Sequence, residues 1–337
     1  MPLQRFESLK KRLRNTGIWL PNPYEALANY NRKVSPLKLV RTGKVKQVYE
    51  VDDETLEFVF TDNISVFDKI IPTSIPYKGE TLCRVAAFWF QLLRKNGIRT
   101  HFKELVPPNR MRVKRVDVIP DYDKLNCKLT NYLIPLEFIS RYYVAGSLFD
   151  RIKAKEILAE DLGFPKNHEP KYGEELPQPF YEMTTKLEKV DRPLTTEEAI
   201  KIAGLTAEEY ERVIELLAKM DQLIASEVQE RMLIHVDGKK ELAFDEKRRL
   251  MVVDTFGTAD EDRWWDEDEY AKGKFTELSK EAVRQYYREI GYYDKLVKAR
   301  KSKKPEPAIP PLPKETADEV SDLYIEMFER ITGESFR

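Results

Sequence analysis

Residues 232–255 of the chain read MLIHVDGKKELAFDEKRRLMVVDT. Two β-rich runs, MLIHVDGKKELAF and RLMVVDT, flank a polar turn at Asp245–Arg248, which predicts an antiparallel hairpin. Successive side chains of a strand point to opposite faces of its sheet. The first run therefore has a polar face and an apolar face, formed by Asp237, Lys239 and Glu241 and by Val236, Leu242 and Phe244 respectively.

The register of this hairpin decides what its polar face can do. If the turn has four residues, Phe244 pairs with Arg249, and Asp254 lies opposite Lys239 on the polar face. Lys239 would then be surrounded by the carboxylates of Asp237, Glu241 and Asp254. Like charges repel unless a cation compensates them, and Mg²⁺ uses few carboxylates when it also binds nucleotide phosphates. The alternative is a solvated outer face with cross-strand ion pairs.

The remaining patterns indicate an α+β fold rather than repeated β-α-β units. They predict strands at 45–51, 55–61, 112–119 and 133–144, a helix at 79–96, and a proline-rich loop at 165–193. Further helices are predicted to begin at the capping boxes Thr195/Glu198, Thr206/Glu209 and Thr316/Glu319, with Gly333 ending the last one. We therefore divide the chain into an N-terminal arm (1–38), a first lobe (39–130) and a second lobe (131–337).

A second cluster of interest is Gly43-Lys44-Val45-Lys46, at the entry to the first hairpin. Gly43 would let the backbone approach a ligand closely, and Lys44 and Lys46 would share one strand face and could hold a polyphosphate. The segment is not a Walker A loop. A surface strand with two lysines is the alternative.

Two further places offer polar groups. Arg141, near the end of a predicted strand, could bind a carboxylate or phosphate with two parallel hydrogen bonds, and Ser147 follows it closely. The segment Thr184–Lys186, followed by Asp191, offers donors and a carboxylate. A structural arginine and a solvated loop remain the alternatives.

The composition excludes several classes of protein. The 57 basic and 58 acidic residues give a formal net charge of -1, so no nucleic-acid-binding field is expected. The N-terminal sequence lacks a signal-peptide core, and no apolar run has membrane-spanning length, which predicts a cytoplasmic protein with no membrane partner. Cys83 and Cys127 lie in apolar stretches without metal-ligand spacing, so both are expected to be packing residues. The three histidines have no zinc-type spacing.

Eight segments, in order, resemble the signature of the phosphoribosylaminoimidazole-succinocarboxamide synthase (SAICAR synthetase) family, whose fold is related to that of ATP-grasp ligases. They span about residues 41–334 and read GKVKQVYEV, TDNISVFDKIIPTSIPYKGETL, PLEFISRYYVAGSL, LPQPFYEMTTK, HVDGKKELAF, VDTFGTADEDRWW, LSKEAVRQYYREIGYY and PPLPKETADEVSDLYIEMFERITG. The resemblance implies a two-lobed α+β fold with antiparallel sheets and flanking helices. The first lobe would bind the nucleotide, and the second would bind substrate and metal.

The resemblance also implies a reaction and its participants. The γ-phosphoryl group of ATP would pass to the carboxylate of 5-amino-1-(5-phosphoribosyl)imidazole-4-carboxylate (CAIR), and the amine of L-aspartate would then displace phosphate to give SAICAR. The implied nucleotide-binding residues are Gly43, Lys44, Lys46 and Glu137, and the implied Mg²⁺ ligands are Glu241 and Asp254. The implied substrate-binding residues are Arg141, Ser147, Asp191, Asp260 and Arg263, and the implied catalytic residues are Lys186, Asp237 and Lys239.

The chain departs from the family pattern at several positions. Glycine is usual where Tyr142 stands, a histidine where Val190 stands, glutamate where Thr255 stands, proline where Ala259 stands, and serines where Glu261 and Asp262 stand. These differences keep two alternatives open. One is a diverged ligase of the same fold with another acid or amine substrate, and the other is a nucleotide-binding protein without catalysis. The sequence leaves open whether the chain forms a homo-oligomer.

Overall fold

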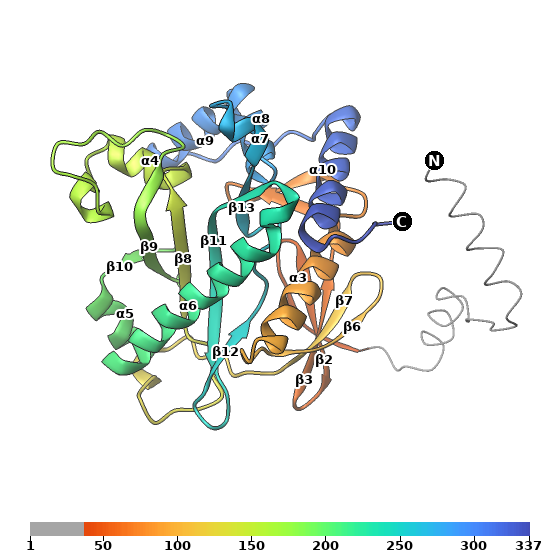
Figure 1. Ribbon diagram of the computed structural model, residues 1–337. Helices are drawn as coiled ribbons and strands as arrows, with labels where there is room; N and C mark the ends of the chain where they lie inside the picture. The colour runs from red at the N-terminus through yellow and green to blue at the C-terminus, as the bar shows by residue number, and fades with distance from the viewer. Residues whose placement is uncertain (1–36) are drawn as a thin grey trace, which may run out of the picture. The chain divides into compact units, whose positions relative to one another are not determined.

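The computed structural model describes residues 37–337. The predicted N-terminal arm, 1–38, lies outside the described residues except for its last two. Residues 39–337 form one compact unit in which helices flank antiparallel sheets, so the predicted α+β class is confirmed (Figure 1). Within residues 37–337, every helix is too short or too polar to cross a bilayer.

The first sheet has five strands in the order β1-β2-β3-β7-β6. The strands are β1 (Lys38–Thr42), β2 (Lys46–Asp52), β3 (Thr55–Phe60), β7 (Arg110–Lys114) and β6 (Phe102–Val106). The predicted hairpin at 45–61 is confirmed, because β2 and β3 pair antiparallel from Lys46↔Phe60 to Asp52↔Thr55. A small ribbon follows, formed by β4 (Asn63–Val66) and β5 (Lys69–Ser74).

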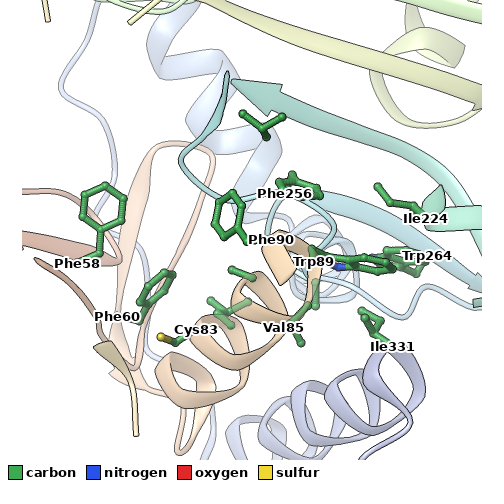
Figure 2. Close-up of a cluster of buried hydrophobic side chains, with 14 of the residues drawn as sticks. Phe58, Phe60, Cys83, Val85, Trp89, Phe90, Ile224, Phe256, Trp264 and Ile331 are labelled. Carbon is green, nitrogen blue, oxygen red and sulfur yellow. The ribbon is translucent and has the colours of Figure 1, made fainter. Parts of the chain in front are cut away.

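Helix α3 (Lys78–Lys95) confirms the helix predicted at 79–96. Its apolar residues recur every three or four positions, so one face is buried against the first sheet and against α10 (Lys314–Thr332). Figure 2 shows Trp89 and Phe90 of this face among aromatic side chains from other elements. The indole Nε1–H of Trp89 donates to the carbonyl of Gly257 at 2.8 Å, which ties α3 to a loop of the second sheet.

The second sheet runs β10-β9-β8-β11-β12, with β13 also paired to β11. The strands are β10 (Pro193–Leu194), β9 (Glu175–Thr185), β8 (Leu136–Tyr143), β11 (Leu233–Phe244), β12 (Leu250–Val253) and β13 (Asp262–Asp266). Helix α6 (Ala207–Val228) crosses one face of this sheet (Figure 1). The opposite face is the one that bears the candidate site.

The prediction of a loop over residues 165–193 is wrong for residues 175–185, whereas residues 186–192 contain no helix or strand. Residues Glu175–Thr185 form β9, the eleven-residue neighbour of β8, in spite of Pro177 and Pro179. A proline cannot donate a ladder hydrogen bond, which normally argues against a strand. Here the prolines fall in the first half of β9, where the pairing with β8 is irregular between Arg141 and Tyr143.

The predicted register of the second hairpin is wrong by one residue. Phe244 pairs with Leu250 rather than with Arg249, because the turn has five residues and the N–H of Asp245 donates to the carbonyl of Arg249 at 3.0 Å. The Asp245 carboxylate accepts the backbone N–H of Arg249 at 2.9 Å, which stabilises the longer turn. A shift of one residue exchanges the faces of a strand, so the position of Asp254 needs a separate explanation.

The other helical segments surround these sheets. They are η1 (Tyr122–Lys124), α4 (Gly146–Lys153), η2 (Ala159–Leu162), α5 (Thr196–Ala203), η3 (Gln229–Arg231), α7 (Glu267–Ala271), α8 (Glu281–Glu289) and α9 (Tyr292–Lys301). The capping boxes of Thr195 and Thr206 are confirmed. Helix α10 begins after Pro313, so the predicted start at Thr316 is wrong, whereas Gly333 ends it as expected. Cys83 is buried, but Cys127 is exposed and is not a packing residue.

Candidate active site

Strands β8 and β11 place the polar side chains on one face of the second sheet. Arg141 pairs with Asp237, and Ile139 pairs with Lys239. The separation of faces predicted for β11 is confirmed for Leu242 and Phe244, which are buried in the main core. Val236, the third residue of the predicted apolar face, lies instead in a separate cluster with Ala145 and Trp265, next to a register shift between His235 and Asp237. The alternation of side chains along the two strands thus places a row of charged groups on the face of the sheet that the core does not cover.

Lys239 lies among three carboxylates, but they are not the predicted ones. Its Nζ is 2.7 Å from Oε1 of Glu241, 2.9 Å from Oε1 of Glu137 and 3.7 Å from Oε2 of Glu261. Of the predicted set, Glu241 is present, whereas Asp237 pairs with arginines and Asp254 with Lys46. The register error explains the loss of Asp254 from this set, because pairing was counted from the wrong turn length.

Two further lysines complete this cluster, which we call the lysine–carboxylate cluster (Lys46, Lys186, Lys239, Glu137, Glu241, Asp254 and Glu261). The Nζ of Lys186, at the end of β9, is 2.5 Å from Oε1 of Glu241 and 3.6 Å from Oε1 of Glu137. Lys46, at the start of β2 in the first sheet, forms an ion pair with Asp254. The cluster therefore joins the two sheets.

Asp254 reaches the cluster through an unusual backbone conformation. In the observed register Glu241 pairs with Val253, so regular strand geometry would turn Asp254 to the other face. Instead the chain leaves β12 at Asp254 with φ 58°, the left-handed region, which aspartate tolerates better than most residues. This turn brings the carboxylate to the same cavity that Glu241 lines.

The cavity has a volume of about 340 Å³ and is polar at one end. Apolar side chains from both sheets form its walls: Val48, Leu56, Phe58, Val113, Val116, Leu133 and Val253. Gly43 and Lys44 lie at its rim, where the Nζ of Lys44 is 2.5 Å from Oδ1 of Asp68 and both side chains are largely exposed. An apolar slot that ends in lysines fits a flat ring carrying a chain of phosphates.

Burial and charge shift the protonation of this cluster. Burial would raise the pKa of Glu241, but Lys239 and Lys186 outweigh it and lower the pKa to about 2. Burial lowers the pKa of Lys46 to about 8, although Glu241 and Glu261 act in the opposite direction. Burial also disfavours the charged form of Lys239, but Glu241, Glu261 and Glu137 raise its pKa well above the ordinary value. Glu241 is therefore an anion and Lys239 a cation at neutral pH.

The donor set at Glu241 and Asp254 fits a magnesium ion that is shared with a nucleotide. Both side chains present hard carboxylate oxygens to the cavity that Lys46 and Lys186 also line, and Lys239 pairs with Glu241 beside it. Among residues 37–337, no group of three or more histidine, cysteine or acidic side chains is arranged to hold a metal by itself. Mg²⁺ commonly takes one or two carboxylates and completes its shell with phosphate oxygens and water.

Next to this cluster, two arginines converge on Asp237. Oδ2 of Asp237 lies 2.5 Å from a guanidinium nitrogen of Arg263 and 3.3 Å from one of Arg141. Arg141 also donates to Ser147 Oγ at 3.1 Å and pairs with Glu182 at 2.5 Å. We call these five residues the arginine cluster. It has the bidentate donors that recognise carboxylate or phosphate groups.

Asp260 does not face the cavity. Its side chain is buried, and its Oδ2 accepts from Lys78 Nζ at 2.9 Å while its Oδ1 accepts from the hydroxyl of Tyr324 at 2.5 Å. Burial would raise the pKa of Asp260, but Lys280 and Lys78 outweigh it and lower the pKa far below the ordinary value. The geometry thus gives Asp260 a structural position between α3 and α10.

Asp191 lies on the exposed segment between β9 and β10. Burial raises its pKa, and the Glu137 carboxylate adds to this effect, whereas Lys186 and Lys239 oppose it. Asp191 is therefore electrostatically coupled to the lysine–carboxylate cluster, with no direct side-chain hydrogen bond to it in the described part of the chain.

Sequence reasoning missed Glu182 and Glu261 as site residues. Glu182 was missed because its segment was predicted to be a loop; as a strand, the alternation of Glu182, Thr184 and Lys186 would have placed them on one face. Glu261 was noted as a departure from the family pattern, but its partner Lys239 is distant in sequence, so no local spacing pointed to the contact.

Comparisons with known proteins identify the family of this chain. The sequence profile of the SAICAR synthetase family matches residues 39–299. The phosphoribosylaminoimidazole-succinocarboxamide synthase of Thermoplasma volcanium is 55% identical over 300 residues, which cover 89% of this chain and 100% of that protein. The enzyme of the same name from Saccharomyces cerevisiae is 30% identical over 318 residues, which cover 88% of this chain and 95% of that protein.

Solved structures share the fold. A SAICAR synthase from Saccharomyces cerevisiae complexed with SAICAR matches with a TM-score of 0.68 at 27% identity, over 89% of this chain and 96% of that one. A type-2 SAICAR synthetase in complex with ADP matches with a TM-score of 0.63 at 25% identity, over 88% and 99% of the two chains. By sequence and by fold, the chain belongs to the SAICAR synthetase family.

Proposed function

We propose that the chain ligates L-aspartate to CAIR at the expense of ATP, giving SAICAR, ADP and phosphate in purine biosynthesis. The single observation that carries this proposal is that Lys46, Lys186, Glu241 and Asp254 line one apolar cavity, with Lys239 paired to Glu241 beside it. Phosphoryl transfer needs positioned cations and no protein nucleophile, and this cluster supplies such groups.

In this proposal the nucleotide lies between the two lobes, 39–130 and 131–337. Its base occupies the apolar part of the cavity, and its phosphates meet Lys46 from the first sheet and Lys186 from the second. Gly43 and Lys44 line the rim, and Glu137 orients Lys239. The ammonium groups stabilise the charge that spreads over the γ-phosphoryl group as it moves to the CAIR carboxylate.

The arginine cluster holds the second substrate. Arg141, Arg263 and Ser147 bind the anionic groups of CAIR, and Asp237 fixes both guanidinium groups in place. The neutral amine of L-aspartate then attacks the acyl phosphate carbon and the C–N bond forms. Inorganic phosphate leaves with the electrons of the former C–O bond and takes up the proton that the amine nitrogen loses. Asp191 lies on the segment that would close over these substrates.

Glu241 and Asp254 would hold Mg²⁺ with the nucleotide. When bound, the ion neutralises negative charge on the phosphate oxygens. The ammonium groups of Lys46, Lys186 and Lys239, which pair with these carboxylates, would then turn from carboxylate to phosphate oxygens. This exchange keeps the buried charges paired in both states.

The test is direct. Purified protein incubated with ATP, Mg²⁺, CAIR and L-aspartate should release ADP and form SAICAR, both detected by chromatography, and omission of CAIR should abolish ADP release. Asp254→Asn should lower kcat by at least about a hundredfold, by analogy with the loss of one group that stabilises developing charge. ADP release equal to that of Asp254→Asn would refute the proposal.

Replacement of L-aspartate by other amino acids in the same assay addresses the amine substrate. We expect L-aspartate to give the highest kcat/KM. A better rate with another amine would show that the departures at Tyr142, Val190 and Thr255 have changed the substrate, whereas ATP binding without turnover would show a protein that has lost catalysis.

A further inference from the structure

Glu261 has no role in the function proposed above, although its carboxylate lines the same cavity as Lys46, Lys186 and Asp254. Its Oε2 is 3.7 Å from the Nζ of Lys239, and its Oε1 accepts a hydrogen bond from the hydroxyl of Thr255 at 3.3 Å. The side chain is 21% exposed, so it borders the cavity rather than the protein surface.

The backbone around Glu261 is fixed on both sides. Asp260 is held by Lys78 and Tyr324, as described above. Asp262 is also buried, and both of its carboxylate oxygens form hydrogen bonds. One is bonded to Nε2 of His235 at 2.7 Å, and the other accepts from the N–H of Gly257 at 2.9 Å. The two acids that flank Glu261 therefore serve as anchors. The loop between β12 and β13 cannot carry the Glu261 carboxylate away from the cavity without breaking these buried pairs.

The contact between Thr255 and Glu261 joins two positions at which the chain differs from the family pattern. Position 255 lacks the usual acid, and position 261 has gained one, while the two side chains touch each other. A carboxylate borne on residue 255 would lie beside the space that the Glu261 carboxylate now occupies. Residues 255 and 261 therefore share one neighbourhood in the fold.

We infer that Glu261 is a positioning residue that, together with Glu241 and Glu137, holds the Lys239 ammonium group beside the cavity and links the binding of Mg²⁺ to that of the nucleotide. The inference rests on the proposed function. A carboxylate beside the phosphates repels them when no metal is present, and it favours the metal-loaded nucleotide. Glu261 should therefore increase the ratio between ADP affinity with Mg²⁺ and ADP affinity without it.

Calorimetric titration of the full chain with ADP, in Mg²⁺ and again in EDTA, measures this ratio. In Glu261→Gln the ratio should fall by about tenfold, the size of effect seen when a group that supports a metal site is removed. The amide keeps the hydrogen bond from Thr255, so the melting temperature should not change. Glu289→Gln, on an exposed part of α8, is the matched control and should keep the ratio of the unaltered chain.

A relocation variant separates a positioning role from a structural one. Glu261→Ser should show the reduced ratio, and Thr255→Glu added to it should restore at least half of the lost ratio, because a carboxylate returns to the same neighbourhood. An unchanged ratio in Glu261→Gln, or no recovery in the double variant, overturns the inference while ligase activity of the unaltered chain persists. Failure of the unaltered chain to bind ADP in either buffer overturns the proposed function as well.

Discussion

Lys46 belongs to the first sheet and contributes its side chain to the candidate site. The charge of this side chain depends on pH. Burial lowers its pKa to about 8, so the ammonium group loses its proton as the pH rises through that value. The loss removes a positive charge that would face the ATP phosphates. We therefore predict that kcat/KM for ATP, which reports the free enzyme, falls as the pH is raised above about 8.

Lys46→Arg tests this assignment, because a guanidinium group keeps its charge throughout this range. The decline in kcat/KM should move to higher pH, even if the absolute rate is lower. Lys103→Arg, at an exposed position of β6, should leave the profile unaltered. An identical alkaline decline in Lys46→Arg would show that another group controls it.

At the scale of single elements, helix α6 shows that local sequence and tertiary packing both stabilise the start of a helix. Its capping box, Thr206 with Glu209, satisfies backbone N–H groups of the first turn. Glu209 also accepts two hydrogen bonds from the guanidinium group of Arg248 at 2.7 Å, so the cap is joined to the turn between β11 and β12. The helix start therefore fixes the hairpin that carries Glu241.

We predict that Thr206→Ala lowers the free energy of unfolding by about 1 kcal/mol, the usual effect of losing such a cap. Urea denaturation measures it. Thr195→Ala removes the equivalent cap of α5, an eight-residue helix, and should have a smaller effect because fewer buried residues depend on it. A larger loss for Thr195→Ala would contradict the view that α6 is the main support of the second sheet.

Strand β9 shows where local rules were insufficient. Its prolines argue against a strand, yet its second half, with Thr184 opposite Glu137, pairs regularly with β8. Pairing with a long, apolar neighbour outweighed the weak local preference. This strand carries Glu182 and is followed directly by Lys186. Because the segment was predicted to be a loop, Glu182 was not predicted to belong to the arginine cluster.

For the whole molecule, the cavity between the two sheets predicts a response to ligand. Mg²⁺-ADP would contact Lys46 of the first sheet and Glu241 of the second, so its binding should stabilise the folded chain. At a hundredfold excess over Kd, the melting temperature should rise by about 4 °C. Lys46→Met should reduce the shift, and differential scanning fluorimetry measures both. No shift with the unaltered chain would argue against a nucleotide site here.

The sequence by itself determined most of the elements and the faces of their side chains. Periodicity is local, so the hairpins, α3, the two capping boxes and the polar face of β11 could be predicted from neighbouring residues. The ordered motifs indicated the family, and the resemblance implied active-site roles for Lys46, Lys186, Lys239, Glu241 and Asp254.

Only the tertiary structure decided which of these charges meet. Lys46 and Asp254 are 208 residues apart in sequence, and their pairing depends on a five-residue turn and one left-handed backbone angle. Likewise, Asp260 is buried between two helices and lies away from the cavity. The loop that Asp260 anchors directs the side chain of Glu261 into the cavity. Sequence periodicity predicts only which face of its own helix or strand a side chain lies on. Ion pairs form between side chains that are close in space but distant in sequence, so periodicity could not predict the partner of each charged residue.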